Sequence, residues 1–99
     1  MDKVNEFRKI ANGLANLYKQ KNIAYGDSFG ISIKKYGLIS ALTRISDKFN
    51  RLEQLILSKT KGNKIDIGDE KLKDTILDMA SYCIMTAMEL DSMENKDNK

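Results

Sequence analysis

Hydrophobic residues recur every three or four positions over three long stretches of this chain. In the first stretch, residues 3–21, they are Val4, Phe7, Ile10, Ala11, Leu14, Leu17 and Tyr18. Because an α-helix completes a turn in 3.6 residues, this spacing gathers them along one side of a helix. Asp2 is a suitable N-cap for that helix, and Asn22 is a suitable end. The first stretch therefore predicts an amphipathic helix over residues 3–21.

Two further stretches predict long helices. Residues 38–58 carry a hydrophobic stripe made of Leu38, Leu42, Ile45, Phe49, Leu52 and Ile56. The last long helix is expected to begin at Asp69, its candidate cap, and to end near residue 90. Its hydrophobic stripe consists of Leu72, Ile76, Met79, Cys83, Ala87 and Leu90. Between the first two long helices, residues 22–37 contain three glycines. They predict a short helix that begins at Asp27 or Ser28 and ends at Gly37. Residues 59–68 predict a basic loop.

The pattern predicts an all-α fold with three long helices and one short helix. Residues 1–90 form a single helical domain, and residues 91–99 form a flexible polar tail. Each long helix would span roughly 30 Å. A chain of 99 residues has little interior to cover the apolar sides of such helices. We therefore expect a homo-oligomer, most simply a symmetric dimer, that completes a helical bundle. The alternative is a monomer whose short helix covers the gap.

Composition excludes several classes of chemistry. The chain has no histidine, which removes histidine-dependent triads and histidine-ligated zinc, and its single cysteine rules out an internal disulfide. The net charge is +3, and residues 1–88 alone carry +5, which suits an anionic ligand better than nucleic acid. The sequence shows no signal peptide and no apolar run long enough to span a membrane. We expect a cytoplasmic protein that has no membrane partner.

A glycine-containing turn is the first candidate for ligand binding. It consists of Tyr25, Gly26, Asp27, Ser28 and Phe29. Such a turn before a helix offers free amides and the positive end of the helix dipole, which suit a phosphate group. The alternative is an ordinary tight turn with a capped helix.

A second candidate group lies on polar lines of the second and third long helices. The second helix contributes Arg44, Asp47, Lys48 and Arg51, and the third contributes Asp74, Asp78 and Tyr82. Three of these carboxylates, Asp47, Asp74 and Asp78, could hold Mg²⁺, since oxygen ligands suit a hard cation. The alternative is a salt-bridge ladder between the two helices. Tyr82 and the other aromatic residues could stack on a base. Cys83, on the predicted buried stripe, is expected to act as a small hydrophobe.

The order of these motifs resembles the nucleotide modification associated domain type 1 family of bacteriophages and bacteria. The resemblance covers residues 21–90 and rests on Tyr25-Gly26-Asp27, on Arg44 to Leu52 with Asn50 and Arg51, and on Asp74 to Tyr82. It implies a nucleotide ligand, which Asn50 would help to bind, and a bacterial host cytoplasm. A more distant similarity is to all-α MazG- and dUTPase-type nucleoside triphosphate pyrophosphohydrolases. Those enzymes carry an ExxE motif, whereas this chain offers only Asp47 and Glu53 on its second helix and DxxxD on its third.

Three functions follow from these observations. The favoured one is binding, and sequestration, of a phosphorylated or cyclic nucleotide, such as an immune signalling nucleotide that a phage would remove from its host. The first alternative is a Mg²⁺-dependent nucleotide pyrophosphohydrolase that uses Asp47, Asp74 and Asp78. The second alternative is an inhibitory module that binds another protein through a methionine-rich helix face.

Overall fold

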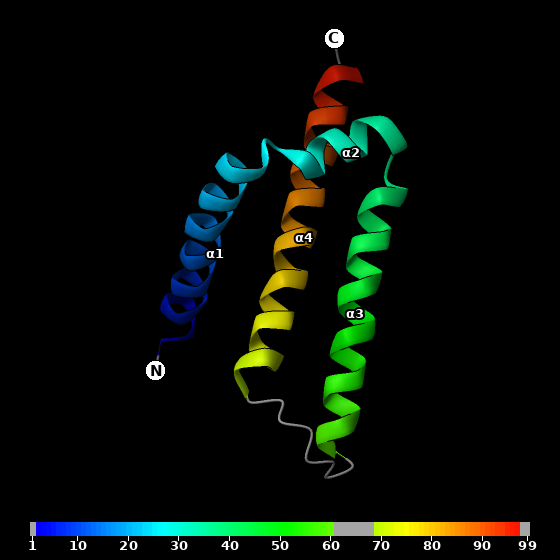
Figure 1. Ribbon diagram of the computed structural model, residues 1–99. Coiled ribbons are helices and arrows are strands. Elements are labelled where there is room, and N and C mark those ends of the chain that lie inside the picture. Colours follow the sequence, from blue (N-terminus) through cyan, green and yellow to red (C-terminus); the bar gives the residue numbers. More distant parts are fainter. Residues whose placement is uncertain (1, 61–68, 98–99) are drawn as a thin grey trace.

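The computed structural model describes residues 2–60 and 69–97, and it confirms the all-α fold. Its four helices are α1 (Lys3–Tyr25), α2 (Ser28–Tyr36), α3 (Ile39–Thr60) and α4 (Asp69–Asp97). Three are long and one is short, as the sequence predicts. The described residues contain no strand. Figure 1 shows the order of the helices along the chain.

The start of α1 agrees with the sequence, whereas its end does not. The carboxylate of Asp2 accepts hydrogen bonds from the backbone N–H groups of Val4 at 3.0 Å and Asn5 at 3.4 Å, which confirms the cap. The helix passes Asn22 and continues to Tyr25. Gly26 ends it in the left-handed conformation, with φ 61°, and donates a hydrogen bond to the carbonyl of Asn22.

The short helix α2 lies between two backbone positions with positive φ. Asp27 stands at its N-cap position with φ 57°, and its side chain makes no capping hydrogen bond. Gly37 ends the helix with φ 78° and ψ −170°, a conformation that suits only glycine. These bounds confirm the predicted short helix.

The last two helices are longer than the sequence predicts. α3 runs to Thr60, so Lys59 and Thr60 belong to this helix, and the rest of the predicted basic loop lies outside the described residues. α4 continues to Asp97, seven residues beyond the predicted end near residue 90. Residues 91–97, expected as a tail, contain no proline or glycine to stop a helix. The predicted cap of this helix would use the side chain of Asp69, which lies outside the described part of the structure.

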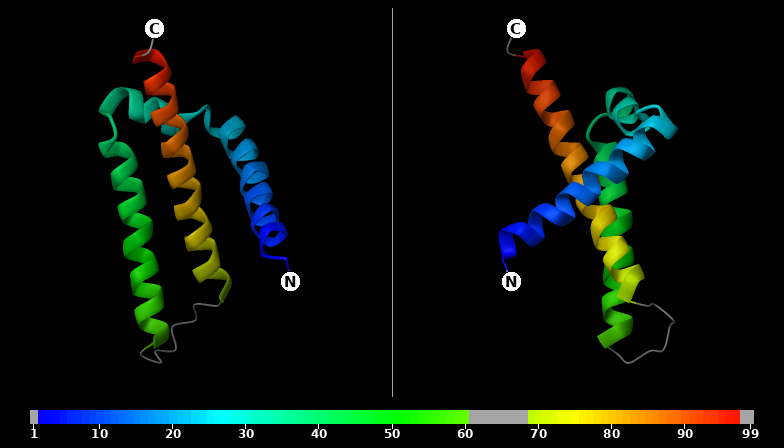
Figure 2. Two further views of the ribbon diagram at one scale, coloured as in Figure 1. Left: turned by 180° about the vertical axis from the view of Figure 1, so that it is seen from behind. Right: turned by 90° about the vertical axis from the view of Figure 1, so that its left-hand side faces the viewer.

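The three long helices lie next to one another, with α4 between α1 and α3, and few residues are buried. α3 and α4 lie side by side and run in opposite directions, and α1 crosses α4 on the side away from α3 (Figures 1 and 2). α2 lies across the end of these helices where α3 begins. The buried hydrophobic residues among those described are Ile33, Ala41 and Leu55, and Thr75 is buried with them. Helix α1 has no buried residue.

The predicted hydrophobic stripes of α3 and α4 are only partly buried: Ile45, Leu52, Leu72 and Met79 are half-buried, and the other stripe residues are exposed. On α3, Ala41 and Leu55 are buried and Lys48 is half-buried, whereas Leu42, Phe49 and Ile56 are exposed. On α4, Thr75 is buried and Tyr82 half-buried, whereas Ile76 and Leu90 are exposed. The prediction that Cys83 is buried is wrong, since it is exposed on the same side as Ile76. Within the described residues, no helix is long and apolar enough to cross a membrane.

Candidate functional site

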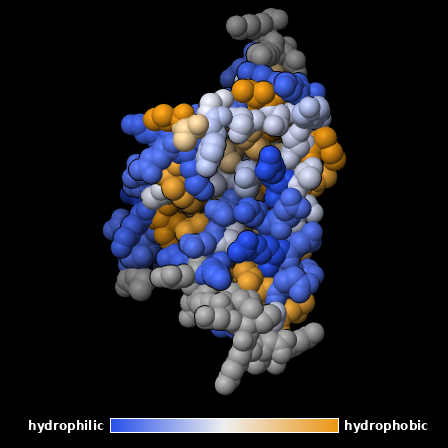
Figure 3. Space-filling model, in the orientation of Figure 1, coloured by the Kyte–Doolittle hydropathy of each residue, from blue (hydrophilic) through white to orange (hydrophobic). Residues whose placement is uncertain are grey.

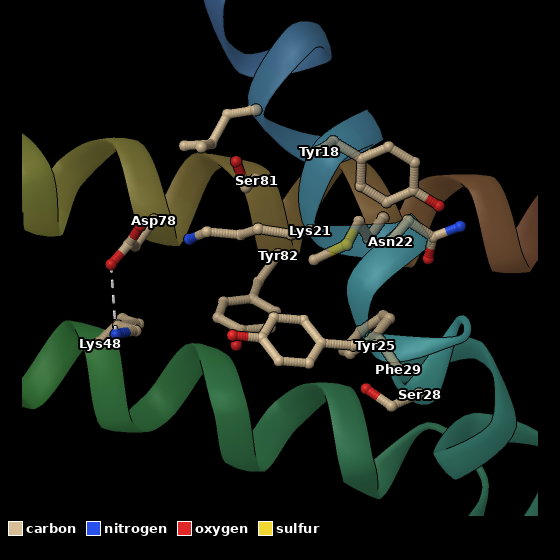
Figure 4. A pocket seen from close by; sticks show the side chains of 12 residues that line it. Tyr18, Lys21, Asn22, Tyr25, Ser28, Phe29, Lys48, Asp78, Ser81 and Tyr82 are labelled. Carbon is tan, nitrogen blue, oxygen red and sulfur yellow. Dashed lines mark hydrogen bonds and ion pairs between the residues drawn. The ribbon is translucent and has the colours of Figure 1, made fainter.

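A pocket of about 250 Å³ lies where all four helices meet. Figure 4 shows it from close by. The residues that line it come from every helix: Leu17, Tyr18, Lys21, Asn22, Tyr25, Ser28, Phe29, Lys48, Asp78, Ser81, Tyr82 and Met85. The pocket therefore collects residues that are as far as 68 positions apart in the chain.

Helix α1 contributes the upper wall through residues one turn apart. Tyr18, Asn22 and Tyr25 follow each other at helical spacing, and Lys21 precedes Tyr25 by one turn. All four line the pocket because α1 continues to Tyr25. A helix that ended at Asn22, as the sequence suggests, would not fix the position of Tyr25. The extra turn of α1 is thus part of how the site is built.

The charged groups of the pocket lie at one end. The Lys48 ammonium is 3.3 Å from Asp78 Oδ2, and these side chains are 28% and 38% exposed. Lys21 extends across the pocket toward the same end (Figure 4) and makes no ion pair with a described residue. Two cations and one carboxylate leave this end with one net positive charge. Because a half-exposed ion pair contributes little to stability, these residues are available to a ligand at small cost.

Aromatic side chains form the other end. The rings of Phe29 and Tyr82 lie 5.5 Å apart between centroids, with planes tilted by 48°, and Tyr25 lies beside them (Figure 4). Such ring pairs are favourable at this separation. Gly30 helps to bring α2 to α4, because a Cβ there would lie 2.8 Å from Glu89 Oε1 and 2.7 Å from Asp27 Oδ2. The site therefore combines a cationic end with an aromatic wall.

The structure brings together about half of the residues that the sequence singles out as ligand-binding. Five of them line the pocket, namely Tyr25, Ser28, Phe29, Lys48 and Tyr82. Five others do not: Gly26, Asp27, Arg44, Asn50 and Arg51. Of these, Arg44, Asn50 and Arg51 are exposed on α3. The alternative interpretation, a salt-bridge ladder of Arg44 and Arg51 with Asp74 and Asp78, is not seen: the ion pair between α3 and α4 in the described part of the chain is that of Lys48 with Asp78.

The three candidate metal ligands do not come together. Asp78 lines the four-helix pocket, and it also lines a neighbouring hollow of about 450 Å³ with Asp74. Asp47 is exposed on α3 and lines neither of them. Among the residues that the structure describes, no three acidic or cysteine side chains come together in a group that could hold a metal ion. Asp78 thus contributes one carboxylate to the pocket.

Sequence reasoning missed several residues of the site. Lys21, Asn22, Ser81 and Met85 were not singled out as ligand-binding, and Tyr18 was assigned to the hydrophobic stripe of the first helix. The helical spacing of Tyr18, Asn22 and Tyr25 is the signal that could have found this wall, had the helix been extended to Tyr25.

The comparisons with known proteins add no relative. No protein family, curated protein or solved structure matches this chain. The resemblance drawn from the motifs therefore stays a prediction, and the site must be interpreted from its own chemistry.

Proposed function

We propose that this protein binds a phosphorylated nucleotide in the four-helix pocket and holds it without cleaving it. The observation that carries the proposal is the division of the pocket into a cationic end, with Lys21 and Lys48, and an aromatic wall, with Tyr25, Phe29 and Tyr82. A nucleotide has the same two parts, an anionic phosphate and a flat base.

The cationic end suits a ligand with a small negative charge. Lysine ammonium groups bind phosphate oxygens as point charges, and Lys21 has no described ion-pair partner to displace. Asp78 reduces the net charge of this end to +1. This end offsets one phosphate charge in full and a second one in part, whereas a triphosphate would bring much more negative charge than the pocket offsets. This balance favours a nucleoside monophosphate or a cyclic nucleotide.

The aromatic wall suits the base. Stacking on an aromatic side chain stabilises a base by roughly 1–3 kcal/mol and tolerates any base identity. Tyr18 and Tyr25 add hydroxyl groups, and Asn22 adds an amide that can both donate and accept. These groups could bind the ribose or the edge of the base.

Binding accounts for the arrangement better than hydrolysis does. A metal-dependent hydrolase needs several carboxylates around one ion, whereas Asp47 and Asp74 do not line the pocket. The proposed role is sequestration, and the family resemblance would make the ligand a nucleotide of phage metabolism or a cyclic immune signal.

We also propose that the chain self-associates. Its accessible surface is 7960 Å², whereas a compact monomer of this mass is expected to expose about 5,700 Å². Its radius of gyration is 16.0 Å, compared with about 13 Å for a compact domain of this length. Many large hydrophobic side chains remain exposed on all three long helices. A second copy could cover them.

Native mass spectrometry tests both proposals at once. The protein is purified from a nucleotide-rich bacterial lysate, its mass is measured, and any bound compound is released by heat and identified. We expect a multimer that carries an intact nucleotide. Recovery of a cleaved product, with Mg²⁺ present, would overturn the binding proposal in favour of hydrolysis. A ligand-free protein that also fails to bind any member of a nucleotide panel would overturn it as well.

A further inference from the structure

The side of the α3–α4 pair that faces away from the pocket is an uncovered hydrophobic surface. Three exposed residues of α3 and three of α4 define what we term the outer face: Leu42, Phe49, Ile56, Ile76, Cys83 and Leu90. Seen from behind, in the left panel of Figure 2, no described helix crosses in front of α3 or α4. By contrast, the middle of the opposite side is mainly hydrophilic (Figure 3).

The placement of these six residues follows from helix geometry. On α3, Leu42, Phe49 and Ile56 each follow directly after a residue that faces inward, namely Ala41, Lys48 or Leu55. A step of one residue turns a side chain by about 100° around the helix axis. All three side chains therefore point to one side of α3.

The same relation holds on α4. Ile76 follows buried Thr75, and Cys83 follows half-buried Tyr82. Leu90 likewise follows half-buried Glu89. Because α3 and α4 run in opposite directions, the one-residue step turns both sets of side chains to the same side of the pair. The two rows thus form one surface, with Phe49 and Cys83 at its middle.

We propose that a second copy of this chain covers the outer face, so that two α3–α4 pairs form a symmetric four-helix bundle. This inference rests on the self-association proposed above and assigns its interface. Both rows have seven-residue spacing, which is the spacing of hydrophobic positions at the interface of paired helices. A two-fold axis requires a surface that complements itself, and this face carries matching rows on its two helices.

At the middle of the outer face, the neighbours of Phe49 and Cys83 also suit close helix packing. Beside Phe49 lie Ser46 and Glu53, and beside Cys83 lie Ala80 and Ala87. Small side chains allow two helices to approach, and Glu53 is the one charged residue among these four. A standard interface covers about 800 Å² of each partner. This area is smaller than the difference between the accessible surface of the chain and that expected for a compact monomer.

This interface leaves the ligand pocket open. None of the six outer-face residues lines the pocket, and its residues Asp78, Ser81 and Met85 lie on the other side of α4 from Ile76, Cys83 and Leu90. Each chain of the dimer would therefore keep a complete site. Ligand binding and pairing would then be independent, with one ligand for each chain.

The test is sedimentation of the wild type and of single aspartate variants without ligand. We expect a dimer, or an assembly of dimers, for the wild type. Phe49→Asp and Leu42→Asp should each halve the mass of the pairing unit, and far-UV circular dichroism should still report a helical protein, because Leu42 is already 61% exposed. The matched control is Phe7→Asp, an exposed phenylalanine on α1, which should leave the mass unchanged.

The single thiol gives a second readout. Cys83 is exposed in one chain and should react slowly with a maleimide in the wild-type dimer, then faster in Phe49→Asp. A monomeric wild type would overturn both self-association and this interface. A wild-type dimer that survives Phe49→Asp and Leu42→Asp would overturn the interface alone. Dissociation by Phe7→Asp, with Phe49→Asp still paired, would place the interface on α1 instead.

Discussion

Replacing Asp78 by asparagine distinguishes nucleotide binding from metal-dependent hydrolysis, because the two functions predict opposite changes in nucleotide affinity. Asp78 supplies the negative charge of the pocket and lies 3.3 Å from the Lys48 ammonium. If a phosphate binds Lys48, its oxygen lies about 3 Å from the same ammonium. The carboxylate and the phosphate are then up to about 6 Å apart and repel each other.

The size of this repulsion follows from Coulomb's law. At about 6 Å it is roughly 0.7 kcal/mol in water and roughly 3 kcal/mol at an effective dielectric constant of 20. Asp78 is 38% exposed, so screening favours the lower part of this range, about 1 kcal/mol. We therefore expect Asp78→Asn to tighten binding of a nucleoside monophosphate or cyclic nucleotide about fivefold.

Isothermal titration calorimetry at fixed salt measures this change. Lys48→Gln is the companion variant and should weaken binding, because it removes the cation and leaves the carboxylate. Thermal unfolding checks that both variants remain folded, which is expected since the ion pair is half-exposed. Loss of binding, or loss of nucleotide turnover in Mg²⁺, in the Asp78→Asn protein would refute this reasoning and support a metal-binding role for Asp78.

Three further predictions concern the pocket and the turns. Tyr25→Leu should weaken nucleotide binding by about 1–3 kcal/mol through lost stacking, whereas Tyr36→Leu, equally exposed at 69% against 68% but outside the pocket, should not change it in calorimetry. Lys21→Gln should weaken nucleotide binding and make the affinity less dependent on salt between 50 and 300 mM, a range over which the Debye length changes roughly twofold. An unchanged dependence of the affinity on salt would exclude contact between Lys21 and the phosphate. Gly37→Ala should destabilise the fold by about 1–3 kcal/mol in urea unfolding because of its positive φ, whereas Gly13→Ala, inside α1 with open space around it, should stabilise it by about 0.5–1 kcal/mol.

The rotation of the long helices explains why only part of the site was predictable. Part of each hydrophobic stripe of α3 and α4 points to the outer face, and the two helices meet through rows that also include Lys48, Thr75 and Tyr82. A sequence pattern predicts which residues share one side of a helix, but it does not say which neighbour that side contacts. Arg44 and Arg51 were grouped with Lys48 for this reason, although they are exposed on α3 and lie outside the pocket.

The sequence by itself determined the all-α class, the positions of the four helices, the cap at Asp2 and the turn at Gly37. These features depend on the local spacing of hydrophobic residues and on the backbone preferences of individual residues, both of which are set by residues close together in the sequence. Only the tertiary structure decided that Lys21, Lys48 and Asp78 share one end of a pocket with an aromatic wall. That outcome depends on how four helices rotate and cross, which is set by contacts between residues far apart in the chain.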